Sequence, residues 1–208
     1  MEKVVERNPV IEKKSVNNIM TALYAFVVIS FFITIVDIII RFPLQSEMID
    51  YNDIQAIVIN VLALLIQIVF FAYGFVNAIR GMLSPKRMGA VIVAFFAATC
   101  ITGTGNMVIN SNVQIVLWWI VLIIPNVVGA VATFAYFVSG KKSKIYSIII
   151  YLAAILGIFR IIYSNYNLIV HANQYLSMNS TVRLVLGIAI HCLVIYQTYV
   201  LWIKRQNA

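Results

Sequence analysis

The sequence predicts an all-α, polytopic membrane protein: a bundle of six transmembrane helices with both termini in the cytoplasm. Of its 208 residues, 62% are hydrophobic and only 11% are charged, whereas soluble domains average roughly 45–50% apolar and about 25% charged residues. The apolar residues gather in six runs of 19 to 26 residues, and a helix that crosses a bilayer needs about 20. Most basic residues lie outside these runs, at alternate connections.

The six runs divide the chain into one membrane domain and two short polar ends. A β-barrel would instead need segments of about 10 residues with alternating polarity, and no such pattern occurs in the sequence. We therefore expect a cytoplasmic polar leader at 1–18, a transmembrane domain at 19–203 and a cytoplasmic tail at 204–208. The expected helices are Ile19–Ile40, Ile54–Ile79, Met88–Ile109, Val113–Val138, Ile145–Tyr163 and Val182–Ile203.

The basic residues predict the orientation in the membrane. Lys and Arg are enriched in cytoplasmic loops, and twelve of the fifteen lie at the chain ends or after the second and fourth runs. The predicted location is therefore the cell membrane, with a multi-pass chain whose N- and C-termini are both inside. This placement accounts for the net charge of +8 without a nucleic acid, and the lipid bilayer is the expected partner.

Two charged residues lie well inside the apolar runs, Asp37 in the first and Arg160 in the fifth. A charge at the centre of a bilayer costs ~2.5–3.5 kcal/mol on insertion scales, so each is expected to face the bundle interior, a watery cavity or the interface. We hypothesise that the two side chains meet in the bundle. Asp37 could instead pair with Arg41 one turn away, and Arg160 could extend its long side chain outward to the lipid headgroups.

The second and third runs add further polar candidates. Asn60 shares one helical face with Gln67 and Gly74 at spacings of seven residues, and such a face in lipid points at other helices. Thr102 and Asn106 belong to a Thr- and Gly-rich segment near the outer end of the third run. This composition weakens a helix and supplies hydroxyl and amide groups. Interhelical hydrogen bonds and a structural kink are the alternative explanations.

The fourth and sixth runs each carry one polar candidate near mid-membrane. Asn126 follows Pro125, and a proline leaves a backbone carbonyl that an adjacent amide can satisfy unless that amide binds a ligand. His191 shares a face with Gly187 and Thr198. A hydrogen-bonded structural histidine and a proton-responsive or ligand-binding one both fit this position.

Enzymatic chemistry is not expected. The sequence has no H-E-x-x-H motif, no second acid inside a run to pair with Asp37, and no serine in a nucleophile motif. We predict no catalytic residues, no metal and no cofactor, and expect both cysteines, Cys100 and Cys192, to be buried reduced thiols. A lipid-modifying enzyme with an unfamiliar site is a weaker option.

The distribution of polar residues indicates a function. The residues predicted to lie in the outer half of the bilayer, with Asn126 at their floor, are Asp37, Asn60, Thr102, Asn106, Arg160 and His191. This asymmetry predicts an outward-facing polar pocket that binds or transports a small molecule. The alternative is a membrane-embedded regulatory or immunity-type protein. It would contact a partner protein through the small-residue face formed by Ala90, Ala94 and Ala98, which lie four residues apart.

Overall fold

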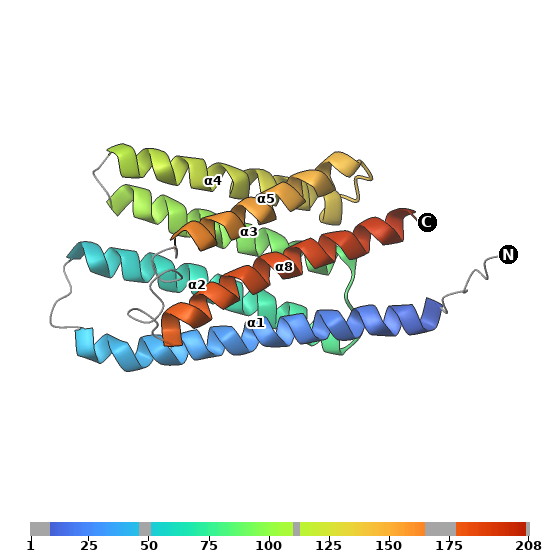
Figure 1. The fold of residues 1–208 in the computed structure, drawn as a ribbon, viewed down its shortest axis with the longest axis horizontal. Coiled ribbons are helices and arrows are strands. Elements are labelled where there is room, and N and C mark those ends of the chain that lie inside the picture. Colours follow the sequence, from blue (N-terminus) through green and yellow to red (C-terminus); the bar gives the residue numbers. More distant parts are fainter. Residues whose placement is uncertain (1–8, 46–50, 110–112, 165–177, 207–208) are drawn as a thin grey trace.

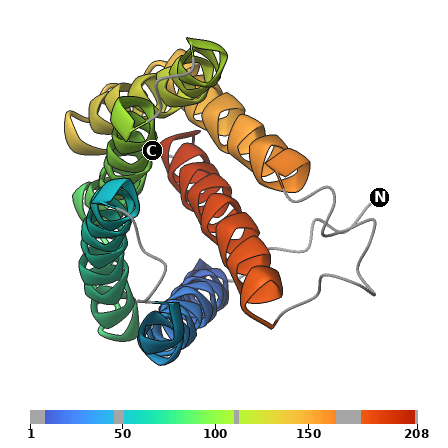
Figure 2. The ribbon, with the colours of Figure 1, turned by 90° about the vertical axis from the view of Figure 1, so that its left-hand side faces the viewer.

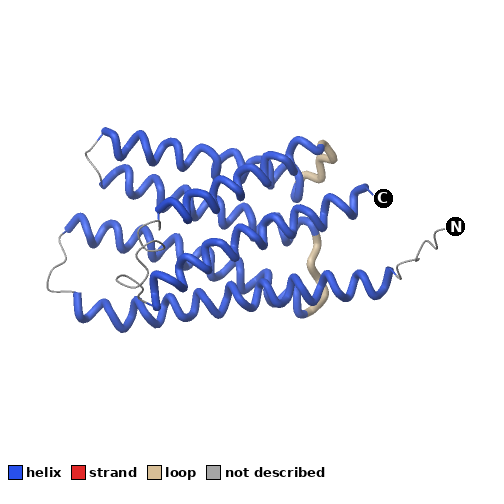
Figure 3. Tube along the Cα trace, in the orientation of Figure 1, coloured by secondary structure: helices blue, strands red, loops and turns tan. Residues whose placement is uncertain are grey.

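The computed structural model describes residues 9–45, 51–109, 113–164 and 178–206, and every regular element in them is helical (Figure 3). The predicted all-α class and the six helices are confirmed. A short π-helix, η2, extends the fourth of them. The elements are α1 (Pro9–Gln45), α2 (Tyr51–Ile79), α3 (Pro85–Ile109), α4 (Val113–Thr133), η2 (Phe134–Val138), α5 (Lys144–Ser164) and α8 (Met178–Gln206).

The helices form a ring in which each packs against its neighbours in the sequence. Helix α8 closes this ring because it packs against both α5 and α1, and it also touches α3 across the interior (Figure 2). The first residue of α1, the last of α8 and the connections 80–84 and 139–143 all lie at one end of the bundle (Figure 1). We call this the inner end and the opposite one the outer end.

Five helices are long and apolar enough to cross a membrane. Their candidate spans are Val16–Val36, Val58–Ile79, Pro85–Thr104, Lys144–Tyr163 and Leu184–Gln206. The described part of α4 and η2 contributes a shorter apolar stretch, Ile123–Val138. Large apolar side chains such as Phe32, Val69 and Phe159 are more than 60% exposed on three different helices. Exposed apolar surface on this scale is unfavourable in water, so the bundle is compatible with a membrane protein.

Helix α1 extends beyond the apolar run Ile19–Ile40 at both ends. It begins at Pro9, within the expected polar leader 1–18, and it continues to Gln45, past Pro43. Proline is favoured in the first turn of a helix because the N–H it lacks has no helical partner there. Pro43 stands two residues before the end of the helix, so few helical hydrogen bonds depend on the backbone beyond it.

The two connections at the inner end are built from standard capping chemistry. Gly81 has φ of +64°, its N–H donates to the Ala78 carbonyl, and the next N–H, of Met82, donates to the Asn77 carbonyl. These bonds satisfy carbonyls that the end of α2 leaves open. Helix α3 then starts with Ser84 as its N-cap, whose hydroxyl accepts from the Arg87 N–H at 3.3 Å.

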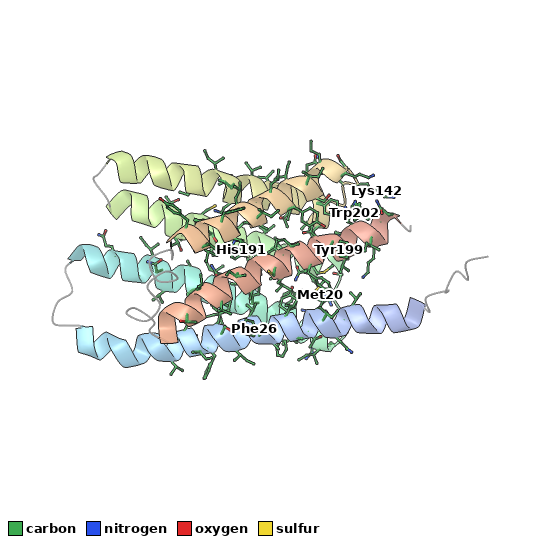
Figure 4. The ribbon with its side chains drawn as sticks, in the orientation of Figure 1. Met20, Phe26, Lys142, His191, Tyr199 and Trp202 are labelled. Carbon is green, nitrogen blue, oxygen red and sulfur yellow. The ribbon has the colours of Figure 1, made fainter. Side chains whose placement is uncertain are left out.

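The end of α8 is tied to the connection between η2 and α5. The Arg205 guanidinium donates to the Tyr136 carbonyl at 2.6 Å and to the Lys141 carbonyl at 2.9 Å. It also lies over the Tyr136 ring, 4.2 Å from the ring centroid. A guanidinium has several donors in a fixed plane, so one side chain holds the end of the π-helix and the turn after it in place. Figure 4 shows Trp202 and Lys142 near this end.

Candidate functional site

His191 is buried at a junction of three helices. Its Nδ1 donates to the Gly187 carbonyl in the preceding turn of α8 at 2.7 Å, and its ring meets Phe95 of α3 edge-on at 4.9 Å between centroids. On the other side, a Cβ at Gly157 of α5 would lie 2.0 Å from Nε2. Because Nδ1–H donates to a carbonyl, Nε2 carries the lone pair, and it lies against α5.

Arg160 is half-buried and lies near this histidine. It interacts electrostatically with His191 of α8 and with Cys100 of α3. Its Cα stands one turn beyond Gly157, on the same face of α5. This position agrees with the interpretation in which the guanidinium faces neighbouring helices rather than only the lipid headgroups.

These three residues lie at one level of the bundle. Cys100, Arg160 and His191 are each 15 or 16 residues from the inner ends of α3, α5 and α8, which corresponds to about 22–24 Å at a rise of ~1.5 Å per residue. In a hydrocarbon layer about 30 Å thick, that level falls in the outer half. We call Cys100, Arg160 and His191 the polar cluster.

The hypothesised contact between Asp37 and Arg160 stays a prediction, because the side chain of Asp37 lies outside the described residues. Its helix, α1, packs against α2 and α8, whereas α5 packs against α4 and α8, so that α8 separates the two (Figure 2). The polar face of α1 does turn inward, because Ser30 and Thr34 are buried.

The other predicted site residues occupy different environments. Asn126 is buried on α4, Thr102 is half-buried on α3, two residues beyond Cys100, and Asn60 is exposed on α2. The side chain of Asn106 lies outside the described residues. Of the face that Asn60 shares with Gln67 and Gly74, only Gly74 is buried, so the expected line of interhelical contacts is confined to the inner part of α2.

A layer of aromatic rings lies between the polar cluster and the inner end. Phe71 of α2 lies 6.5 Å from Phe95 of α3, and Phe95 lies 5.4 Å from Phe96, as ring centroids. Tyr24 and Phe31 of α1 extend the layer through Phe71, at 6.2 and 5.6 Å. All five rings are at most 4% exposed, so they close the middle of the bundle beneath His191. We call Phe71, Phe95 and Phe96 the aromatic floor.

Beside the floor, a polar contact joins α1 and α8. Gln197 donates from Nε2 to the Tyr24 hydroxyl, and both side chains are 0% exposed. Gly74 of α2 makes room for the phenol, since a Cβ there would lie 2.3 Å from the Tyr24 ring. Among the described residues, Gln197 Oε1 is the one buried side-chain oxygen or nitrogen without a hydrogen-bond partner. Residue spacing does not predict this contact, because Gln197 does not lie on the helical face that His191 shares with Gly187 and Thr198.

Packing differs between the two halves of the bundle. Among the described residues of α5, Ser147, Ile150, Ala153 and Ala154 are buried, but no residue from 155 to 163 is. In α2 the same contrast holds between the inner part, where Phe71 is buried, and residues 58–62, none of which is. The polar cluster therefore lies in a part of the bundle where fewer residues of α2 and α5 are buried than at the inner end.

Three further predictions bear on partners and chemistry. Ala94 and Ala98 are buried and Ala90 is half-buried, so this chain's own helices already cover much of the small-residue face expected to contact a partner. Cys100 and Cys192 are both free, but Cys192 is exposed rather than buried, because it points outward from α8 while His191 points inward. Within the described residues, no three His, Cys, Asp or Glu side chains form a group able to hold a metal ion.

The fold defines the chain as an all-helical bundle with an apolar exterior, compatible with a membrane protein. No protein-family model, curated protein or solved structure matches it.

Proposed function

We propose that this chain is an integral membrane protein of six transmembrane helices that binds or transports a small molecule through an outward-facing polar pocket. The observation that carries the proposal is the convergence of Cys100, Arg160 and His191 from three helices at one level, in the less enclosed half of the bundle. Polar side chains that only stabilise their own helices have no reason to lie together at one level of the bundle. Ligand sites typically combine an apolar wall with a few convergent polar groups.

The chemistry of the cluster suits recognition more than catalysis. Arg160 supplies several N–H donors and a fixed positive charge. His191 supplies an acceptor at Nε2, because its Nδ1–H is engaged by the Gly187 carbonyl. Gly157 keeps the imidazole against α5, one turn from the guanidinium. A ligand that enters from the outer end would meet a donor and an acceptor whose positions are set by helix packing.

The aromatic floor would hold the ligand on the outer side. For transport, Phe71, Phe95 and Phe96 must separate so that the ligand passes inward, whereas for binding alone they can stay closed. The contact between Tyr24 and Gln197 joins α1 and α8 beside this floor.

The proposed orientation places the inner end in the cytoplasm. Eight basic residues lie at the inner end, in its described connections and in the helix ends beside them, and the sequence after Asp53 has no Asp or Glu. Basic residues favour the cytoplasmic side of a membrane. The eight are Arg80, Lys86, Arg87, Lys141, Lys142, Lys144, Lys204 and Arg205.

Cysteine labelling tests this orientation. In a chain without its own cysteines (Cys100→Ser, Cys192→Ser), a single Ser111→Cys should react with a membrane-impermeant maleimide on intact cells. A single Ser143→Cys should react only after permeabilisation, because the connection 139–143 lies at the basic inner end. The measurement is the labelled fraction on a gel. The opposite pattern would invert the orientation and move the pocket to the cytoplasmic side.

A thermal-shift screen tests the binding function. A library of small polar metabolites is added to the detergent-purified protein, and each compound that raises the midpoint is tested again on Arg160→Gln and His191→Gln. A ligand of this pocket should stabilise the wild type and lose most of the shift in both variants, since ligand binding stabilises only the state that binds it. Cys192→Ser is the matched control, because this side chain is exposed next to His191. Hits that act equally on all four proteins would argue against the pocket.

A further inference from the structure

We propose that the bundle binds anionic phospholipid at one corner of its inner end, where the connection 139–143 and the start of α5 meet the end of α8. This inference goes beyond the pocket proposed above and rests only on the membrane placement that belongs to that proposal. Exposed lysines from both sides of the corner carry it. We call Lys142, Lys144 and Lys204 the lysine corner.

The two sides of this corner are held together by Arg205. Its guanidinium donates from α8 to the carbonyls of Tyr136 and Lys141. The backbone that carries Lys204 therefore lies beside the backbone that carries the other two residues of the lysine corner, and Figure 4 shows Lys142 at this end of α8. Lysine side chains are long and flexible, so they can reach the same patch of headgroups from both backbones.

The lysine corner lies at the boundary of two candidate spans. The span of α5 begins at Lys144, and the span of α8 ends at Gln206. Aromatic side chains with polar atoms gather at the same level, because the rings of Tyr199 and Trp202 lie 6.5 Å apart as centroids and Tyr199 is 47% exposed. Tyr and Trp are enriched where a membrane meets water. The level of the lysines is therefore that of the lipid headgroups.

The charge of the inner end stays positive whatever ion pairs it contains. Eight basic residues lie there, and the 18 residues before the first apolar run add four bases and three acids. The other four acids, from Asp37 to Asp53, belong to the outer part of α1, the start of α2 or the sequence between them. Pairing within the inner end therefore leaves most of its positive charge uncancelled, and this charge attracts an anionic leaflet.

The expected preference follows from the charge of the lysines. One lysine near an anionic membrane surface contributes about fivefold to binding. An anionic lipid that meets two or three of them should be favoured over a zwitterionic lipid by at least about tenfold. Salt should weaken this preference, since the Debye length falls from about 10 Å at 0.1 M to about 3 Å at 1 M.

Trp202 provides a reporter at this corner. Trp118→Phe and Trp119→Phe leave it as the single tryptophan of the chain, and the protein is reconstituted in phosphatidylcholine vesicles. Brominated phosphatidylglycerol or brominated phosphatidylcholine is added, because bromine on the acyl chain quenches a tryptophan beside the lipid. Quenching against mole fraction gives the affinity ratio of the two lipids. We expect phosphatidylglycerol to be favoured at least about tenfold, and by less than about threefold in 1 M NaCl.

Variants assign the preference to the lysine corner. Lys142→Gln, Lys144→Gln and Lys204→Gln together should lower the ratio to within about threefold. Arg80→Gln with Lys86→Gln is the control, because it removes two exposed charges at the other inner connection and should change the ratio by less than about twofold. Emission of the reporter in phosphatidylcholine alone checks the fold of each variant, and the salt measurement needs no change in the lysines.

Four results would overturn the proposal. A ratio within about twofold before any lysine is replaced would show no preference for anionic lipid, and an equal loss in the control variant would show that the charge acts without a site. A larger effect of inorganic phosphate than of chloride at equal ionic strength would identify a soluble anion as the occupant. These three results leave the membrane placement and the pocket intact. Failure of both lipids to quench Trp202 would count against the membrane placement as well.

Discussion

Replacing Gly157 with alanine should lower the thermal midpoint of the purified protein by roughly 6–12 °C, the largest effect that we expect from adding one methyl group to this chain. The new Cβ would lie 2.0 Å from Nε2 and 2.4 Å from Cδ2 of His191. The ring has little room to move, because Nδ1 donates to the Gly187 carbonyl and Phe95 packs against the imidazole edge-on. Overpacking of a buried site costs up to about 3 kcal/mol, and each kcal/mol shifts the midpoint of a chain of this size by ~2–4 °C.

Gly187→Ala is the matched control for this prediction. Gly187 lies at the same interface between α5 and α8, but its added Cβ would meet only Cδ1 of Ile161, the far end of a flexible side chain, at 2.8 Å. We expect a shift of less than half that of Gly157→Ala. In a background of His191→Ala, the alanine at 157 should cost little more, since the group it collides with is gone. Additive costs in the double variant would show that the contact with His191 is not the cause.

Replacing Gly89 with alanine should lower the midpoint by roughly 4–12 °C, through a different mechanism. Here the added Cβ would lie 2.4 Å from Cβ of Phe137 and 3.2 Å from Cγ2 of Val138. A neighbouring Cβ is attached to the backbone and cannot rotate away, so α3 and η2 must separate. We estimate a cost of about 2–3 kcal/mol from overpacking. Ala97→Leu on the same helix is the control, because its side chain is exposed and should change the midpoint by about 1 °C or less.

The same substitution should be coupled to Arg205. Its guanidinium holds the Tyr136 carbonyl, one residue before Phe137, so displacement of η2 also strains this bond. Arg205→Ala alone should cost about 1–2 kcal/mol, as expected for charge-assisted bonds at a partly exposed site. The double variant should be less destabilised than the sum of the two single ones, by at least about 1 kcal/mol, in thermal or denaturant unfolding. Strict additivity would mean that the two contacts act on separate elements.

The sequence pattern predicts two of the three residues of the polar cluster but not the third. The sequence singles out Arg160 and His191 because each is a polar residue within a long apolar run. The structure places the two residues near each other. Cys100 was missed as a neighbour, since a thiol in an apolar run gives no signal of its own. The contact of Asp37 with Arg160 stays a prediction, and the helices that carry these two residues, α1 and α5, both pack against α8. Charge alone does not predict which helices are adjacent.

The alanine face of α3 also shows what residue spacing cannot predict. Ala90, Ala94 and Ala98 were correctly recognised as a face for close helix contact, but their spacing does not say whether the contact lies within the chain or with a partner. In the structure Ala94 and Ala98 are buried by the chain itself. The glycines that matter most, Gly89 and Gly157, stand out only when the facing side chains, Phe137 and His191, are known.

Local composition was enough to predict the helical class and the number of helices in the described residues. Apolar run length decides whether a helix can cross a membrane, and basic residues between the runs mark one side, so both depend only on neighbours in sequence. Tertiary structure decided which polar residues meet, that rings from three helices close the inner half, and that α8 completes the ring. These features depend on contacts between residues far apart in the chain, which are set by shape and close packing rather than by the period of any single helix.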